Sequence, residues 1–288
     1  MFTKVAIIGV GLIGGSLARV LRDAGVAEEV IGFGRNVEHL QQAVNLGAID
    51  RAASSLADAV KDADLVVLAT PVGATKDLLA DIAPMLAETT VVTDVGSTKS
   101  GVTHIARETL KDHFGYFVPG HPIAGREESG VTASSGDLFK DHVVVLTPVS
   151  ETRKTAVSRV QNLWKLAGAE VSLLDPEIHD QIFAACSHVP HVLAFMLVDL
   201  LVRQDNHKAV FEFSAGGFRD FTRIASSDPV MWRDICLENS KAIAGVLRQY
   251  QSEIKKTIDA IELGDGKKLI ETFERAKHAR DLYIKNKT

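Results

Sequence analysis

The sequence predicts two domains of different class, an α/β domain with a parallel sheet followed by an all-α domain. In the first half, short apolar runs alternate with amphipathic stretches, which is typical of βαβ units. Glycines at positions 9, 11 and 14 directly follow the first apolar run. After Asp175-Pro176 nearly all of the chain has the periodicity of helices. We therefore assign residues 1–174 to the first domain and residues 175–288 to the second.

Length and charge narrow the class of protein further. The chain has 288 residues, which is too long for one small domain. Hydrophobic residues make up 46% and aromatic residues only 6%, as expected for an aliphatic α/β core. The net charge is −5 and no long basic run occurs, so we expect no nucleic-acid partner. Anionic substrates must instead be bound by local arginines and histidines.

Five apolar runs are predicted to be strands of the first domain, buried on both faces. They are Lys4–Ile8, Val30–Phe33, Leu65–Ala69, Val91–Asp94 and Val143–Leu146. The stretches between them are predicted to be helices, namely Gly14–Ala24, Val37–Leu46, Thr75–Met85 and Lys99–Leu110. A further helix, Glu151–Leu166, leads to a last strand over Val171–Leu174.

The helical half contains long apolar stretches. Val192–Val202 is apolar, whereas the run from Ser252 to Lys285 is amphipathic and charged. Residues 194–198 and Ile243–Leu247 are apolar around most of the helix, which indicates burial on every side. Such helices lie either inside one subunit or between two subunits.

The sequence gives no indication of export or of a membrane. The first strand begins almost at the N-terminus and leaves no room for a signal peptide. We identify no apolar run of the roughly 18–20 residues that a membrane span needs. Cys186 and Cys236 are too far apart for a metal or disulfide motif, and we expect both to be small buried residues. A soluble protein of the reducing cytoplasm, without a membrane partner, is expected.

The three glycines form the motif Gly9-x-Gly11-x-x-Gly14, with Leu12 and Ile13 inside it. The motif follows a strand and opens a helix, which is the context in which it binds a dinucleotide. Gly9 allows a tight turn, Gly11 lets the backbone approach a pyrophosphate, and Gly14 allows close packing of helix and strand. The helix N-terminus supplies N–H groups and partial positive charge to the phosphates. The first domain is therefore predicted to be a Rossmann-type nucleotide-binding domain.

The end of the second strand indicates which dinucleotide binds. An NAD enzyme usually has Asp or Glu about 20 residues beyond the glycines, where it accepts hydrogen bonds from the ribose 2′-hydroxyl. Here that position is Gly34, followed by Arg35 and Asn36. No carboxylate repels a 2′-phosphate, and Arg35 is placed to pair with one. We predict NADP as the cofactor; the alternative is that Arg35 is a solvated surface residue and NAD is also accepted.

Two further strand ends lie at the edge where open α/β sheets bind ligands. Thr70 and Pro71 follow the third predicted strand, and we expect them to form part of the wall around the nicotinamide and its ribose. Asp94 ends the next strand, where its simplest role is to cap a helix that starts near Ser97 or Thr98.

Five more segments follow the glycine motif along the chain. They are Asp94-Val95-Gly96-Ser97-Thr98-Lys99, Gly120-His121-Pro122-Ile123-Ala124-Gly125, Ser187-His188-Val189-Pro190-His191, Gly216–Ala225 and Asp228–Arg233. Together, in this order and as far as about residue 240, these segments resemble the prephenate and arogenate dehydrogenases of tyrosine biosynthesis. The resemblance implies an NAD(P)-dependent oxidoreductase that forms a homodimer through the helical domain.

The resemblance also implies a cyclohexadienol substrate with a 4-hydroxyl group, a ring carboxylate and a side chain that ends in a carboxylate. His121, which we expect on a loop, is then the catalytic histidine that takes the hydroxyl proton, and Ser97 orients the hydroxyl or His121 itself. A histidine with a pKa of about 6.5 is available as the neutral imidazole. His191 faces the substrate, His188 supports the site, and Arg223 binds the ring carboxylate.

One position departs from the pattern of the family. Many relatives have a small or hydroxyl residue before the glutamate, whereas this chain has Arg126 before Glu127. Arg126 adds a cation at the mouth of the pocket, for a substrate carboxylate or the cofactor, and Glu127 is expected to pair with Arg223 or a substrate ammonium group. His188 and His191 are three residues apart, but no cysteine or carboxylate completes a ligand set, so we predict no metal.

Two alternatives remain open. A β-hydroxyacid or imine-reducing dehydrogenase has the same plan, but the hydroxyacid group is expected to carry a lysine where Ile182–Leu193 has histidines and no lysine. A non-catalytic NADP-sensing protein would keep the glycines but would need neither His121 nor Arg223. Prephenate and arogenate differ by a keto group versus an amine, and the sequence does not distinguish them.

Overall fold

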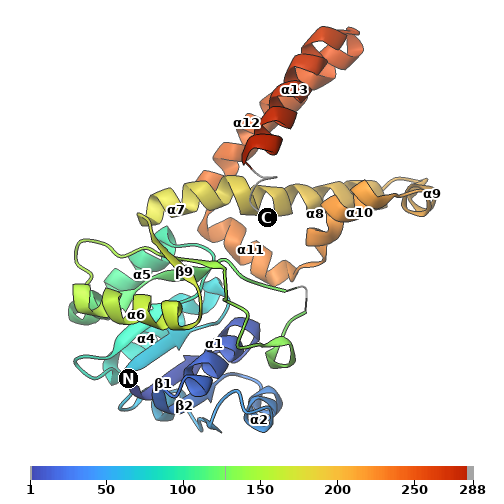
Figure 1. Cartoon of the computed structure of the whole chain (residues 1–288). Coiled ribbons are helices and arrows are strands. Elements are labelled where there is room, and N and C mark those ends of the chain that lie inside the picture. The colour runs from blue at the N-terminus through green and yellow to red at the C-terminus, as the bar shows by residue number, and fades with distance from the viewer. Residues whose placement is uncertain (1, 127, 284–288) are drawn as a thin grey trace. The chain divides into compact units, whose positions relative to one another are not determined.

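A computed structural model describes residues 2–126 and 128–283, and the chain divides into two compact units between Ser240 and Lys241. The first unit begins with an α/β domain that contains a parallel sheet, and helices follow it along the chain (Figure 1). The predicted fold class, a Rossmann-type domain followed by an all-α domain, is confirmed. The boundary at residues 174 and 175 stays a prediction, because the division between the compact units lies further on, within the helical half.

The main sheet has six parallel strands in the order β3-β2-β1-β4-β5-β6. They are β1 (Phe2–Ile8), β2 (Ala27–Phe33), β3 (Arg51–Ala52), β4 (Leu65–Leu68), β5 (Val91–Asp94) and β6 (Phe117–Val118). β1 pairs with β2 on one side and β4 on the other, with Ile8 opposite both Phe33 and Leu68. The strand order reverses at β1, and such sheets bind ligands at the carboxyl ends of the strands beside this reversal.

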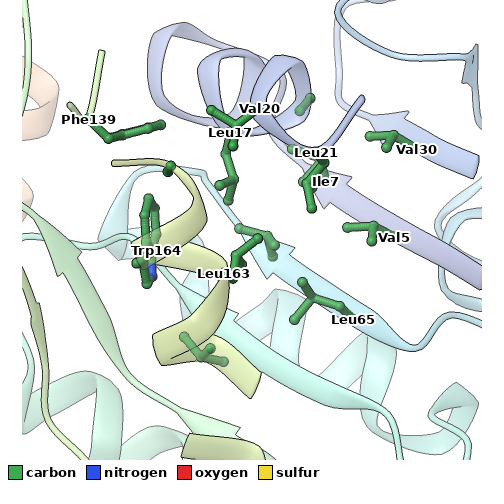
Figure 2. Close-up of a cluster of buried hydrophobic side chains, with 14 of the residues drawn as sticks. Val5, Ile7, Leu17, Val20, Leu21, Val30, Leu65, Phe139, Leu163 and Trp164 are labelled. Carbon is green, nitrogen blue, oxygen red and sulfur yellow. The ribbon is translucent and has the colours of Figure 1, made fainter. Parts of the chain in front are cut away.

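Helices cover both faces of this sheet. They are α1 (Leu12–Asp23), α2 (Val37–Asn45), α3 (Leu56–Val60), α4 (Thr75–Ile82), α5 (Ser100–Leu110) and α6 (Lys154–Leu166). Val5 and Ile7 of β1 pack with α1 and α6 on one face (Figure 2), whereas Ala6 and Ile8 pack with α3, α4 and α5 on the other. This alternation is the period of two that a strand imposes. In the main sheet and the helices that cover it, the elements absent from our prediction are α3, β3 and β6, which have only two to five residues each.

Three strands form a second sheet in the order β7-β8-β9. They are β7 (Gly120–Pro122), β8 (Val143–Leu146) and β9 (Glu170–Leu173). β7 runs antiparallel to β8, and β9 runs parallel to it. Residues 143–146 are thus a strand, as predicted, but they do not extend the main sheet. The expectation that His121 lies on a loop is wrong, because it is the middle residue of β7 and lies opposite Val145.

The remaining helices of the first unit begin with α7 (Pro176–Phe183) and end with α11 (Pro229–Glu238). Between them lie α8 (Val189–Val202), α9 (His207–Glu212) and α10 (Gly216–Thr222). A single π turn, η5 (Ala184–His188), joins α7 to α8. Pro190 explains this turn, because proline lacks an N–H group and its ring clashes with the carbonyl four residues before it. Cys186 in this turn is exposed, so the expectation that both cysteines are buried is wrong.

The last two helices are α12 (Ser240–Glu262) and α13 (Gly266–Tyr283). The amphipathic run from Ser252 to Lys285, which has helical periodicity, is therefore interrupted. The interruption falls at Gly264, which has a φ of +68°. Glycine adopts this left-handed conformation without the steric cost that a Cβ would bring, and it commonly ends helices.

The helical run Pro176–Val202 has 27 residues and contains an 18-residue window with a mean hydropathy of 1.7, so it is long and apolar enough to cross a membrane. The expectation that no run reaches this length is wrong, because the π turn keeps α7 and α8 continuous, and Val192–Val202 is only part of the run. One such helix is weak support for a membrane span. This one also carries His179, Asp180 and His188, all of which are buried within the first unit.

Candidate active site

The glycine turn between β1 and α1 has the geometry that a dinucleotide needs. Gly9 has a φ of +99°, and a Cβ on it would lie 2.5 Å from the carbonyl oxygen that follows β4. A Cβ on Gly14 would lie 2.2 Å from the carbonyl oxygen of Gly9, so only glycine lets α1 approach β1 here. A Cβ on Gly11 would meet no atom within 4 Å, and no side chain caps α1 before Leu12 and Ile13. Open space beside the N–H groups of a helix N-terminus fits a pyrophosphate.

The residues after β2 lie at the same edge of the sheet. Arg35 is exposed and accessible to a ligand. Asn36 is exposed, but its Oδ1 accepts a hydrogen bond from the N–H of His39 at 3.0 Å and thereby caps α2. A Cβ on Gly34 would have Leu40 as its nearest neighbour, at 3.8 Å, so a Cβ fits at this position.

Thr70 and Pro71 follow β4 beside the glycine turn. The Cγ2 atom of Thr70 lies 3.0 Å from the position of a Cβ on Gly9, so Thr70 borders the turn directly. Shortly after Pro71, a Cβ on Gly73 would lie 2.6 Å from Oδ2 of Asp234 in α11. A ligand at this edge of the sheet therefore also has the helical half as its neighbour.

Asp94, at the end of β5, does not cap a helix as we expected. α5 begins only at Ser100, and Asp94 instead forms an ion pair with Lys99. Both side chains are buried. Ser97 lies between the two elements and is half-buried.

His121 is the end of a chain of three buried side chains. Its Nδ1 lies 2.9 Å from Nε2 of His179, and Nδ1 of His179 lies 2.8 Å from Oδ1 of Asp180. His179 and Asp180 belong to α7, so the chain connects the helical half to β7. The Asp180 carboxylate also accepts the backbone N–H groups of Lys99 and Ser100, each at 2.8 Å.

The carboxylate determines where the protons of this chain lie. An ionised Asp180 can only accept hydrogen bonds, so Nδ1 of His179 carries a proton and Nε2 of His179 is an acceptor. Nδ1 of His121 must then donate to His179, which leaves a lone pair on Nε2 of His121. The chain therefore orients His121 as a proton acceptor through Nε2.

Burial keeps both histidines of this chain neutral. It lowers the pKa of His121 well below the usual 6.5, and charge on His179, Lys99 and His188 acts in the same direction. Burial also lowers the pKa of His179, against the opposing effect of Asp180. For Asp180, burial acts to raise the pKa, but hydrogen bonds from His179 and from backbone N–H groups outweigh burial and lower it.

A second group of aromatic and polar residues joins α8 to α11. His191 is half-buried and stacks on Trp232, with ring centroids 3.9 Å apart, and its Nδ1 lies 2.9 Å from the carbonyl oxygen of Ser187. His188 is buried, its Nδ1 lies 3.1 Å from Nδ2 of Asn239, and burial lowers its pKa to about 4. Within the part of the chain that the structure describes, no group of three or more His, Cys, Asp or Glu residues is suited to a metal.

The predicted cations lie at the surface of the first unit. Arg223 directly follows α10 and is exposed. Burial lowers the pKa of His191, and the positive charge of Arg223 lowers it further. Arg126 follows β7, is exposed, and donates from Nη1 to the carbonyl oxygen of Ala133 at 3.4 Å. Glu127 lies outside the described residues, and its predicted pairing with Arg223 stays a prediction.

Our reading of the sequence missed His179 and Asp180, and it assigned no role to Lys99. The one local signal was that His179 and Asp180 are adjacent, since a carboxylate beside an imidazole can orient it by a hydrogen bond. The contact with His121 itself gave no such signal, because 58 residues separate the two histidines.

The fold and the site together define a class of protein. A glycine turn lies beside the reversal of strand order. The buried, neutral imidazole of His121 directly follows Gly120, whose N–H donates to Asp94 at the carboxyl end of β5. Exposed arginines occur on the segments that follow β7 and α10. This is the site of a nicotinamide-dependent dehydrogenase in which a Rossmann domain precedes a helical domain.

The chain belongs to the prephenate dehydrogenase family. Residues 17–173 match the family model of the prephenate dehydrogenase nucleotide-binding domain, and residues 175–275 match the model of its dimerization domain. The resemblance found in the sequence is thereby confirmed.

Individual relatives are similar along nearly the whole chain. The cyclohexadienyl dehydrogenase of Zymomonas mobilis is 37% identical over 284 residues, which cover 97% of this chain and 96% of the relative. The prephenate dehydrogenase of Bacillus subtilis is 39% identical over 98% of this chain and 76% of its own length. Among solved structures, A. aeolicus prephenate dehydrogenase in complex with hydroxyphenyl propionate and NAD+ has a TM-score of 0.90 at 36% identity, covering 97% of this chain and 98% of the other.

Proposed function

We propose that the protein catalyses the oxidative decarboxylation of prephenate, arogenate or both, with hydride transfer to NADP, in tyrosine biosynthesis. Prephenate yields 4-hydroxyphenylpyruvate and arogenate yields tyrosine. The observation that carries the proposal is the buried chain from Asp180 through His179 to His121, which leaves a neutral imidazole as a proton acceptor. Relatives named cyclohexadienyl, prephenate and arogenate dehydrogenase support the class of substrate.

In this reaction, Nε2 of His121 accepts the proton of the substrate 4-hydroxyl, and Ser97 orients that hydroxyl or the imidazole. The nicotinamide, when bound, accepts the hydride from ring carbon 4. The carbonyl formed at carbon 4 is conjugated with the ring, so the bond to the ring carboxylate breaks and its electrons pass through the ring to the carbonyl oxygen. That oxygen takes a proton back from His121. Release of carbon dioxide and aromatisation make the reaction effectively irreversible.

The substrate carboxylates need cations. Arg223 binds the ring carboxylate, because a guanidinium offers two parallel N–H donors to one carboxylate. His191 faces the substrate and is held flat against Trp232, while the interior His188 supports the site. Arg126 is the cation assigned to the side-chain carboxylate or to the cofactor.

The helical domain also forms a homodimer in this proposal. Met196, Leu200 and Val202 of α8 are 58%, 53% and 49% exposed in the single chain. Burial of apolar surface contributes about 25 cal/mol per Å², so a second copy that covers this helix stabilises both chains. The match to a dimerization domain supports this arrangement. A dimer that covers this apolar helix needs no membrane, and we assign the protein to the cytoplasm.

The cofactor proposal predicts a higher kcat/KM with NADP than with NAD. The double variant Gly34→Asp/Arg35→Ala is expected to reverse this order, because the introduced carboxylate would accept from the 2′-hydroxyl and repel a 2′-phosphate. A Cβ at position 34 meets no atom closer than 3.8 Å. Steady-state kinetics with both cofactors on both proteins is the measurement. The NAD+ in the A. aeolicus relative makes NAD the alternative, and a wild-type preference for NAD would contradict the assignment of Arg35.

The pH profile provides a second prediction. His121 must be neutral to accept a proton, and burial lowers its pKa well below 6.5, with the charge of Lys99 acting in the same direction. We therefore expect kcat/KM to stay level from neutral pH down past 6.5 and to fall only at lower pH. Initial rates in a series of acidic buffers measure this fall in kcat/KM. Only pH values at which circular dichroism shows a folded protein are used. An acidic midpoint at or above 6.5 would contradict the buried neutral base.

Four assays, each substrate with each cofactor, test the function as a whole. Prephenate and arogenate are each supplied with NAD and with NADP, and the reduced cofactor and released carbon dioxide are followed. Turnover with either substrate is the expected result, with equal amounts of reduced cofactor and carbon dioxide. A non-catalytic NADP-sensing protein would bind the cofactor and turn over neither substrate.

A further inference from the structure

Gly120, the residue before His121, has both of its backbone polar groups held by one buried ion pair. Its N–H donates to Oδ1 of Asp94 at 3.1 Å, and its carbonyl oxygen accepts from Nζ of Lys99 at 2.8 Å. Lys99 is 0% exposed and Asp94 is 2% exposed. A Cβ on Gly120 would lie 2.9 Å from the carbonyl oxygen of Asp94, so β7 comes this close to β5 only because residue 120 is glycine.

Lys99 also contacts the other end of the histidine chain. Its backbone N–H donates to Oδ1 of Asp180 at 2.8 Å, and the same oxygen accepts from Nδ1 of His179. One residue therefore holds the neighbour of His121 with its side chain and the neighbour of His179 with its backbone. Because these two histidines come from distant parts of the sequence, contacts of this kind determine how their rings meet.

Stability alone does not account for a buried pair of this kind. Replacement of a buried ion pair by apolar residues of similar volume is often neutral or stabilising. An ammonium group, however, has three donors and can join a carboxylate and a carbonyl in one fixed geometry. Geometry matters at a proton acceptor, because a displacement of about 1 Å can lower a rate by about 10²-fold.

We propose that Lys99, paired with Asp94, is a positioning residue that holds His121 in register with His179 for proton transfer. The ion pair anchors Gly120 from both sides, and the backbone of Lys99 anchors Asp180. This inference rests on the proposed role of His121 as the proton acceptor of the reaction.

The first test is the variant Lys99→Met, which removes the ammonium group and keeps much of the side-chain volume. We expect kcat with prephenate or arogenate to fall by about 10- to 100-fold. The Kd of the cofactor is expected to stay near the wild-type value, because the glycine turn is not touched. In a His121→Asn background the same substitution should lower kcat no further, because residues that act as one unit are not additive.

The control is Leu163→Ala, which opens the buried core beside α6 and removes a side chain that makes no hydrogen bond to Lys99, Asp94 or Asp180. It is expected to lower the melting temperature in both backgrounds without a change in kcat. Wild-type kcat in folded Lys99→Met would overturn the proposal, and so would an equal loss of kcat with and without His121.

A second variant covers the case in which Lys99→Met fails to fold because Asp94 is left charged and buried. Asp94→Asn/Lys99→Met removes both charges together, and we expect the same loss of kcat. If neither protein folds, the pair is a determinant of stability and the proposal is overturned. Wild-type kcat in His121→Asn would contradict the proposed function. Wild-type kcat in the Lys99 variants, together with a lowered kcat in His121→Asn, would contradict this inference alone.

Discussion

Replacement of His121 by asparagine is expected to lower kcat with prephenate or arogenate by about 10²–10⁴-fold, the usual contribution of general acid–base catalysis. An asparagine amide can still donate a hydrogen bond to Nε2 of His179, so the local structure should persist. It has no lone pair of comparable basicity, and it cannot take the hydroxyl proton. Steady-state kinetics measures the loss, and fluorescence titration with NADPH should show an unchanged Kd.

The matched control is His104→Asn. His104 lies on α5 with a side chain that is 68% exposed, so its replacement removes an imidazole without a change in the interior. We expect wild-type kcat for this control. Near-wild-type kcat for His121→Asn would show that another group accepts the proton, and the assignment of His121 would be wrong.

Replacement of Arg223 by alanine is expected to raise KM for the substrate strongly while kcat changes less. A charge-assisted contact to a carboxylate contributes about 1.5–3 kcal/mol, which corresponds to about a 10- to 150-fold change in KM. Arg223→Lys should have an intermediate effect, because lysine keeps the charge but lacks the two parallel donors. The measurement is the dependence of initial rate on substrate concentration at saturating cofactor.

Arg219→Ala is the control for this prediction. Arg219 is also exposed and lies four residues earlier on α10, so both variants remove a guanidinium from the same surface segment. We expect a normal KM for Arg219→Ala. An unchanged KM in a folded Arg223→Ala protein would remove Arg223 from the substrate site.

The fold class could be predicted because local sequence carries its signals. Strands such as Val91–Asp94 and Val143–Leu146 were predicted with the bounds that the structure has, since each is a short apolar run with clear ends. Helix starts were less accurate, and α5 begins at Ser100 because a carboxylate from α7 caps it. The local sequence of α5 does not predict this cap, because the carboxylate comes from a residue 80 positions away from Ser100.

The candidate site was only partly predictable. Gly9 and Gly14 could be assigned because their requirements are local, a positive φ and a close approach of one helix to its own strand. The expected helix cap at Asp94 was wrong, because the competing partner, Lys99, is favoured only once both are buried together with Gly120.

What the sequence by itself determined was the order of elements, the dinucleotide turn and the family, because periodicity and motif spacing are local properties of the chain. What only the tertiary structure decided was the state of His121. Its neutrality comes from burial, and its orientation comes from His179 and Asp180. These contacts join segments 58 residues apart, and hydrogen-bond geometry and desolvation exist only after such segments pack together.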